Sequence, residues 1–245
     1  MLAVATYNVH SCIGIDGRHD PGRVATVIRG LEADIIALQE VDARDRPSGY
    51  LDQWTFLGAA TGTQAIPGIS LRTHRNLFGN ALLSRHPVRA VRLHDLSVSG
   101  REPRGAIDAD IEIDGRVVRI VATHLGLRQG ERRRQAEFLL KILAHTPVEV
   151  GPPRVATLVL GDLNEWRRGA KSSITSLIRW SGAPPTSSPA SFPARYPLLP
   201  LDRVLIHGGL ALVECRVDRS PVARKASDHL PVRATLRWLP EGARA

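Results

Sequence analysis

Carboxylates, amides and imidazoles recur along this chain in short clusters, and each cluster directly follows a run of apolar residues. The clusters are Asn8, Glu40, His124, Asp162 with Asn164, and Asp228 with His229. These side-chain types bind hard divalent cations and contact phosphate oxygens. Buried strands that end at one edge of a packed sheet would hold them in a single basin. The pattern therefore predicts metal-assisted hydrolysis of a phosphate ester.

Four apolar runs, at residues 2–7, 33–38, 117–123 and 155–160, lead into the first four clusters. They are short and rich in aliphatic and β-branched residues, which is typical of strands buried on both faces. We expect helices over residues 21–31, 129–145 and 172–180, and a last strand over 231–238. Alternating strands and helices indicate a layered α and β architecture.

Two regions lack clear periodicity, residues 45–79 and the Pro- and Ser-rich residues 182–193. The second has the composition of a domain linker. The residues that follow it are too few for an independent core, however, so it reads better as a loop at the active site. We expect both regions to be loops that determine substrate specificity.

Length and composition favour one domain over residues 1–245, since a chain with 43% hydrophobic residues can bury a substantial core. No stretch approaches the roughly 18 apolar residues of a membrane-spanning helix. We expect a soluble, cytoplasmic monomer without stable membrane insertion. Cys12 and Cys215 are the only cysteines, which excludes a disulfide framework and a four-cysteine zinc site.

The net charge of +9 suggests nucleic acid as a possible partner. The densest basic run, Arg128 with Arg132, Arg133 and Arg134, begins an expected helix, and we interpret it as that helix's solvated side. Aromatic residues make up only 4% of the chain and leave few platforms for unstacked bases. Charge alone therefore does not establish nucleic-acid binding.

Six motifs in order resemble the endonuclease/exonuclease/phosphatase superfamily. They span residues 6–10, 38–41, 79–85, 123–125, 161–164 and 227–231. The resemblance implies an α+β fold of the DNase I type, a four-layer α/β/β/α sandwich of two mixed sheets flanked by helices. It also implies a Mg²⁺ or Mn²⁺ site in the cleft between the sheet ends.

Three residues are candidates for the metal site. A carboxylate at Glu40, after so apolar a strand, needs compensation that a cation provides, unless the strand end is exposed. Asn8 could offer an oxygen to the metal or a donor to phosphate, or merely end its strand. The resemblance makes Asp228 a second ligand, where the plain alternative is a turn.

Asp162 and Asn164 face the same side if their segment stays extended. The carboxylate would then deprotonate a water while the amide stabilises charge on the phosphate; the alternative is a tight turn. His124 could donate to phosphate or to a backbone carbonyl. The resemblance makes His229 a phosphate contact.

Asp202 matches the family's aspartate that pairs with the late histidine and fixes its tautomer, although it could instead pair with Arg203. Asn80, which opens an expected strand, resembles the family's asparagine near the phosphate. Arg104 could clamp a phosphate oxygen or pair with Glu102.

Together these residues predict direct in-line attack of water on phosphorus. Our first hypothesis is a phosphodiesterase or phosphatase for small or lipid-derived phosphate esters. The second is a DNA or RNA endonuclease or exonuclease, which His10 disfavours because it stands where abasic-site nucleases of this superfamily have an aspartate. The third, an inactive binding module on the same fold, is disfavoured because every expected acid, amide and imidazole is present.

Overall fold

A computed structural model gives the fold and describes residues 1–44, 51–74, 76–145, 154–182 and 188–240. The strands are β1 (Leu2–Asn8), β2 (Ile35–Arg44), β3 (Leu51–Asp52), β4 (Gln64–Arg72), β5 (Asn76–Ser84), β6 (Val88–Asp95), β7 (Gly105–Ile113), β8 (Arg116–His124), β9 (Arg154–Asp162), β10 (Asp202–Gly208), β11 (Leu210–Val217) and β12 (Val232–Trp238). The helices are α1 (Pro21–Gly30), α2 (Gln53–Thr61), α3 (Gln129–Ala144), α4 (Thr175–Ser181) and α5 (Pro221–Ala226), with short 3₁₀ helices η1 (His10–Cys12) and η2 (Gly169–Lys171). The strands and helices predicted from the sequence are present, and their ends agree within about three residues, except that the strand expected over 33–38 continues to Arg44 as β2.

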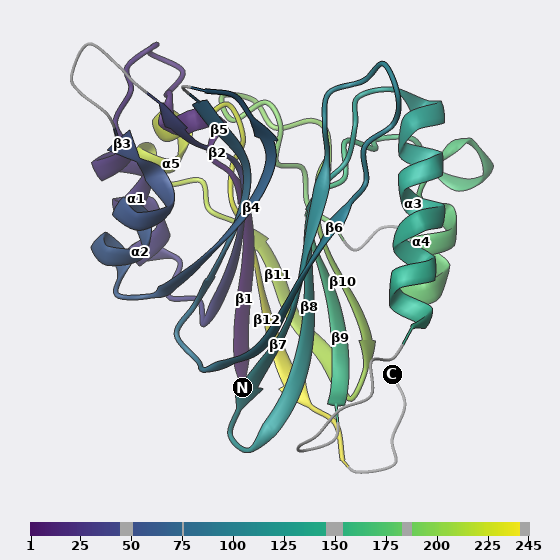
Figure 1. Cartoon of the computed structure of the whole chain (residues 1–245). Helices are drawn as coiled ribbons and strands as arrows, with labels where there is room; N and C mark the ends of the chain where they lie inside the picture. Colours follow the sequence, from purple (N-terminus) through teal and green to yellow (C-terminus); the bar gives the residue numbers. More distant parts are fainter. Residues whose placement is uncertain (45–50, 75, 146–153, 183–187, 241–245) are drawn as a thin grey trace.

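Two mixed sheets pack face to face, and helices cover the outer face of each (Figure 1). One sheet has the strand order β11-β12-β1-β2-β5-β4, with β3 paired to β2, and the other has the order β10-β9-β8-β7-β6. Within each sheet, one central pair is parallel, β1 with β2 and β8 with β9. This is the expected four-layer α/β/β/α sandwich.

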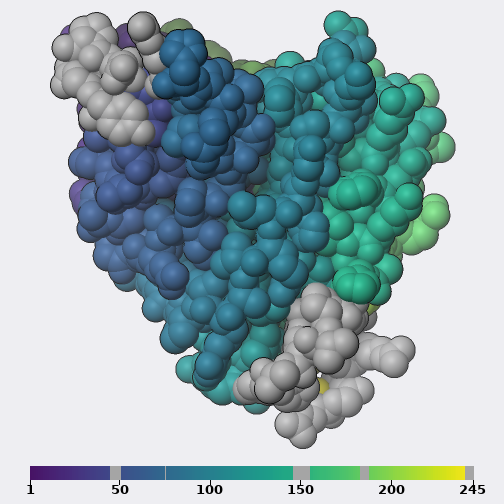
Figure 2. All heavy atoms as spheres, in the orientation of Figure 1, coloured from purple at the N-terminus to yellow at the C-terminus, as the bar shows by residue number. Residues whose placement is uncertain are grey.

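Three apolar layers explain why the central strands are apolar on both faces. Val4 of β1 and Ile120 of β8 pack between the sheets. Tyr7 of β1 packs under α1 and α2, whereas Val121 of β8 packs under α3. Each fully buried aliphatic side chain contributes about 1.5–3 kcal/mol relative to an exposed one. Each sheet with its helices forms one half of the molecule, and the two halves meet in one continuous surface on the face drawn in Figure 2. No described helix is long and apolar enough to cross a bilayer.

The expectation that residues 45–79 form an irregular loop is wrong for most of the part that the structure describes, which contains β3, α2, β4 and the start of β5. The Asp52 carboxylate begins α2 by accepting the backbone N–H groups of Trp54 (2.9 Å) and Thr55 (3.3 Å). Gly62, with φ 65°, ends it in the left-handed conformation. Asp at the start and Gly at the end are typical of a helix, and they indicate α2 in a region whose hydrophobic periodicity is weak.

The interpretation of the arginine run as a solvated face is wrong for one member. Arg132 lies on the buried face of α3. Its guanidinium donates to Ser173 Oγ (3.1 Å) and to the Leu127 carbonyl (2.6 Å). Arg133 and Arg134 are exposed, as expected. Buried carbonyls and the nearby Glu165 carboxylate, 3.5 Å from Arg132, compensate this cation.

Candidate active site

Strand register brings the predicted residues to one end of the sandwich, opposite the N-terminus in Figure 1. His124 is the register partner of Asp162 across β8 and β9, and Asp162 is the partner of Asp202 across β9 and β10. The three side chains therefore form one row across neighbouring strands. In the other sheet, Asn8 ends β1 beside Gln39 of β2.

Glu40 enters the site from a break in the ladder between β2 and β5, whose register shifts between Leu38 and Val41. Its φ of 57° is unusual for a residue with a Cβ and costs about 1–2 kcal/mol. Such a bulge re-aims a side chain next to a functional site. Asn8 Nδ2 donates to Glu40 Oε1 (3.0 Å) and to Asp162 Oδ2 (3.2 Å), so one amide joins a carboxylate from each sheet.

Asp162 is buried at the centre of the row, and burial together with the neighbouring Asp202 carboxylate raises its pKa. Its Oδ1 accepts the backbone N–H of Asn164 (2.8 Å). Asn164 has a φ of 50°, so the expectation of an extended segment is wrong. The turn nevertheless places its amide Nδ2 beside His124 Nε2 (3.0 Å), and the same nitrogen donates to the Leu125 carbonyl (2.9 Å).

His229 and His124 have opposite electrostatic surroundings. Burial disfavours a charged ring at both, and it holds the pKa of His124 well below the usual range, with Arg104 adding to the effect. At His229 the Asp202 carboxylate overcomes burial and raises the pKa to about 10. Asp202 Oδ2 lies 2.8 Å from His229 Nδ1 and accepts the Ser191 hydroxyl (2.6 Å). The Asp202 carboxylate therefore favours the protonated ring of His229, whose Nε2 lies 3.7 Å from Asp162 Oδ2.

A pocket of about 400 Å³ opens over this row. Its lining includes seven predicted residues, Glu40, Arg104, His124, Asp162, Asn164, Asp228 and His229. Asn8 and Asp202 are buried and contact these residues without lining the pocket themselves. The pocket is completed by Phe78, Glu102, Leu127, Trp166, Phe192, Leu199 and Leu201.

Asn80 departs from its prediction. It lies in the middle of β5 rather than at the start of a strand, and its amide donates to the Gly105 carbonyl (3.1 Å). It is absent from the lining of the pocket. Its predicted contact with phosphate has no geometric support.

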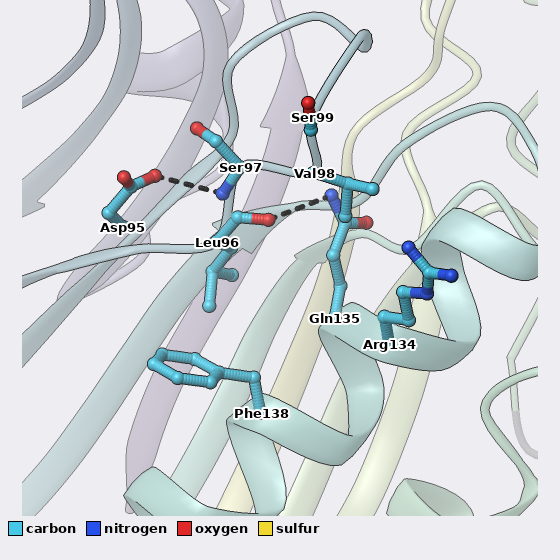
Figure 3. Close-up of a pocket in the computed structure, with 8 residues that line it drawn as sticks. All are labelled: Asp95, Leu96, Ser97, Val98, Ser99, Arg134, Gln135 and Phe138. Atoms are coloured by element: carbon cyan, nitrogen blue, oxygen red, sulfur yellow. Dashed lines mark hydrogen bonds between the residues drawn. The ribbon is translucent and has the colours of Figure 1, made fainter.

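Arg104 ends the loop that joins β6 to β7, and α3 holds the beginning of that loop (Figure 3). Gln135 of α3 donates to the Leu96 carbonyl (3.2 Å), and the Arg104 backbone N–H donates to Ser97 Oγ (3.2 Å). The guanidinium lies 3.1 Å from Glu102, as the alternative interpretation expected. Its buried Nε has no hydrogen-bond partner among the residues that the structure describes.

Sequence reasoning missed two serines that position the site. Ser191 orients Asp202, and Ser227 donates its hydroxyl to the Asn8 carbonyl (2.7 Å) while accepting the His229 backbone N–H (3.2 Å). Ser191 lies in a Pro- and Ser-rich segment with no distinguishing pattern. Ser227 belongs to the last motif, where its position before Asp228 was the available signal.

The donor set fits a hard divalent cation at the Glu40 side of the pocket. In the described part of the chain, Glu40 and Asp162 form no ion pair with a lysine or arginine, and the partly exposed Asp228 lines the same pocket. Ligand atoms of Asp162, Asp202 and His229 also lie within 4.8 Å of one another. Asp202 Oδ2 is already engaged by His229 and Ser191, however, which favours the Glu40 side. The Asn8 oxygen accepts the His10 N–H (3.1 Å), so Asn8 orients the carboxylates in this geometry.

Comparisons with known proteins agree with the fold. The chain is 28% identical over 250 residues to the uncharacterized protein YbhP of Escherichia coli strain K12, covering 95% of each chain. An endonuclease/exonuclease/phosphatase from Beutenbergia cavernae superposes with a TM-score of 0.77 at 26% identity, covering 99% of this chain and 73% of that one.

The fold is also shared, at a TM-score of 0.70 and 13% identity, with D. rerio TDP2 complexed with a single-strand DNA product, covering 96% of this chain and 98% of that one. The model of the Endonuclease/Exonuclease/phosphatase family matches residues 5–229. Proteins of this family generally hydrolyse phosphoester bonds. This chain, with its row of acids and imidazoles at the sheet ends, belongs to the Endonuclease/Exonuclease/phosphatase family.

Proposed function

We propose that the protein is a divalent-metal-dependent phosphodiesterase or phosphatase that acts on small or lipid-derived phosphate esters. One observation carries the proposal: two carboxylates without a lysine or arginine partner in the described chain share the Asn8 amide, in a pocket also lined by Arg104 and His229. Acidic and basic groups so arranged suit a phosphate bound between a cation and positively charged side chains.

In the proposed reaction, Glu40 and Asp228, with Asn8 orienting Glu40, would hold Mg²⁺ or Mn²⁺. The bound cation would neutralise charge on a phosphate oxygen. Asp162 takes a proton from the attacking water, a role that its raised pKa favours. His229, held by Asp202, donates from Nε2 to a phosphate oxygen.

Arg104 would contact a second oxygen through its unpartnered Nε. Asn164 and His124 reach the phosphate once their mutual hydrogen bond is exchanged for bonds to its oxygens. Water attacks phosphorus directly as the opposite ester P–O bond breaks, and the leaving oxygen takes a proton from solvent. The products are the free alcohol and a phosphate with one ester bond fewer, so no covalent enzyme intermediate is required.

Asp162→Asn tests the assignment of the base. The amide keeps the shape of the carboxylate but cannot accept the proton, so turnover of bis-p-nitrophenyl phosphate should fall by roughly 10²–10⁴. The matched control is Glu112→Gln, which removes a surface partner of Arg89 and should leave turnover unchanged. Circular dichroism should show that both variants are folded. Full activity in Asp162→Asn would refute the assignment.

Substrate and metal are tested with the wild type. We expect turnover of bis-p-nitrophenyl phosphate or p-nitrophenyl phosphate with Mg²⁺ or Mn²⁺, none with EDTA, and little cleavage of an abasic-site duplex. A nuclease is the second candidate, favoured by the net charge of +9. Efficient cleavage of the duplex without turnover of the small esters would establish the nuclease instead.

A further inference from the structure

A small hairpin at the pocket exposes large apolar side chains. Phe192 and Leu199 pair as a β-bridge at its base and line the pocket. Between them, Tyr196 is 68% exposed and Leu198 is 76% exposed, next to the exposed Arg195. These are among the most exposed large apolar residues in the described chain.

The hairpin is fastened to the catalytic loop and to α5. The Ala194 N–H donates to the Asp228 carbonyl (2.7 Å), and the Leu230 N–H donates to the Ser191 carbonyl (2.9 Å). Arg224 of α5 donates to the Arg195 carbonyl (2.9 Å). These hydrogen bonds hold the backbone of the hairpin in place on two sides, with its apolar tip at the surface.

Two other segments at the same pocket have a similar character. Leu127, 67% exposed, and Trp166, 42% exposed, both line the pocket. The segments that carry them also expose Arg128, Arg168 and Lys171, and the Gln129 side chain joins these segments by donating to the Lys171 carbonyl (3.0 Å). Exposed apolar side chains with cations next to them therefore occur both on the hairpin and on these two segments, all at one pocket.

We propose that this mouth, formed by Leu127, Trp166, Tyr196 and Leu198, docks on an anionic lipid surface. Tyrosine and tryptophan favour the membrane interface, leucines bury in its acyl boundary, and the adjacent arginines and Lys171 pair with anionic headgroups. The aliphatic Leu127 and Leu198 carry no charge for a phosphodiester and no hydrogen-bonding group for a base edge, which favours lipid over nucleic acid. Docking would present a phosphate ester of the membrane directly to the pocket, and only this last step rests on the proposed function.

Vesicle sedimentation with the full chain tests the proposal. The probes are vesicles of phosphatidylcholine alone and vesicles containing phosphatidylglycerol, at low and high salt. We compare the wild type with the double variant Tyr196→Ser/Leu198→Ser. The matched control is Leu212→Ser/Val213→Ser, which alters two exposed residues, 41% and 52% exposed, on the edge strand β11. That strand begins beside Val155, at the end of β9 opposite Asp162.

The wild type and the control should bind the anionic vesicles, and binding should weaken with salt. The hairpin variant should partition at least about tenfold more weakly. No binding by the wild type, equal binding to both vesicle types, or equal loss in both variants would overturn the proposal. So would a hairpin variant that loses affinity for a single-stranded oligonucleotide while still binding vesicles.

Two further measurements separate this proposal from the proposed function. The hairpin variant should hydrolyse soluble bis-p-nitrophenyl phosphate like the wild type, because neither tip residue lines the pocket. Asp162→Asn should bind vesicles normally although it is inactive. An absence of vesicle binding by the wild type with intact hydrolysis would contradict the docking proposal alone. An absence of hydrolysis by the wild type with intact vesicle binding would contradict the proposed function alone.

Discussion

At the scale of single residues, the His229 imidazole depends on one buried acid. Asp202 is fully buried, accepts hydrogen bonds from His229 and from the Ser191 hydroxyl, and fixes which ring nitrogen faces the pocket. It also lies opposite Asp162 in the strand register, so two buried carboxylates repel each other across β9 and β10. The repulsion between Asp162 and Asp202 is therefore an energetic cost of placing an acid that orients His229.

Asp202→Asn should separate these two effects. An asparagine of the same shape no longer stabilises the His229 cation, so turnover should fall by roughly 10–100-fold, as for other residues that orient a catalytic group. Thermal stability should change little, because the loss of the His229 contact is offset by relief from Asp162. Steady-state kinetics and thermal denaturation check both. Unchanged turnover would show that His229 functions without its partner.

Residue types and their order predicted most of the residues that the structure brings together at the pocket, but local backbone conformations were not predictable. Glu40 and Asn164 both adopt positive φ, which glutamate in particular rarely does. The surrounding strands and the Asn8 and His124 contacts impose these conformations. Asn80 was misplaced for a related reason, since a motif residue within a strand gives no sign of which neighbour its amide will reach.

At the scale of elements, Arg119 of β8 fastens α3 to the second sheet. Its guanidinium donates to Asp108 of β7 at 2.9 and 2.7 Å. It also donates to the carbonyls of Ile142 (2.9 Å) and His145 (3.0 Å) at the C-terminal end of α3. Helix α3 in turn holds the loop that ends at Arg104, so this buried ion pair supports the site from a distance.

Acid should loosen this connection. Burial raises the pKa of Asp108, but hydrogen bonds from Arg119 and Arg92 outweigh it and hold the pKa well below the ordinary 3.8. The ionised carboxylate therefore stabilises the fold fully above about pH 4, and this contribution is lost as the pH falls through and below that value. Asp108→Asn should cost about 3–5 kcal/mol at pH 7, because it leaves Arg119 without its buried counter-ion.

Urea unfolding of both proteins between pH 7 and pH 2.5 measures this difference, which should shrink on the acid side. Glu112 lies on the same strand as Asp108 and pairs with Arg89 at the surface. Glu112→Gln breaks that pair and should lower the free energy of unfolding by no more than about 1 kcal/mol. A difference between the wild type and Asp108→Asn that stays constant with pH would show that another acid controls the transition.

Element types were predictable where one apolar pattern persisted over a whole strand or helix, as in β1, β9 and α3. The region of α2 and β4 was not, because β4 is an edge strand that buries little and α2 lacks a distinct apolar face. Arg132 was misjudged because a buried arginine looks like an exposed one in sequence. Its partners, Ser173 and the Leu127 carbonyl, depend on tertiary packing.

At the scale of the whole molecule, the site lies where the two sheets meet. Asn8 and Glu40 belong to one sheet, His124, Asp162 and Asp202 to the other, and Asp228 and His229 to the loop before β12. The fold could be inferred from the order of motifs, but the pairing of carboxylates across the sheets required the structure. A cation held by Glu40 and Asp228 would neutralise acids at the junction of the two sheets and would bind the folded chain only.

Metal should therefore stabilise the whole molecule, and this effect should depend on Glu40. Mg²⁺ or Mn²⁺ at 100 times its dissociation constant adds about 2.7 kcal/mol to the free energy of unfolding, which raises the midpoint of thermal unfolding by several degrees. Glu40→Gln retains a group that Asn8 can contact but removes the charge, so most of this rise should disappear. Glu112→Gln should keep it. An equal rise in Glu40→Gln would place the cation elsewhere, with the group of Asp162, Asp202 and His229 as the remaining candidate.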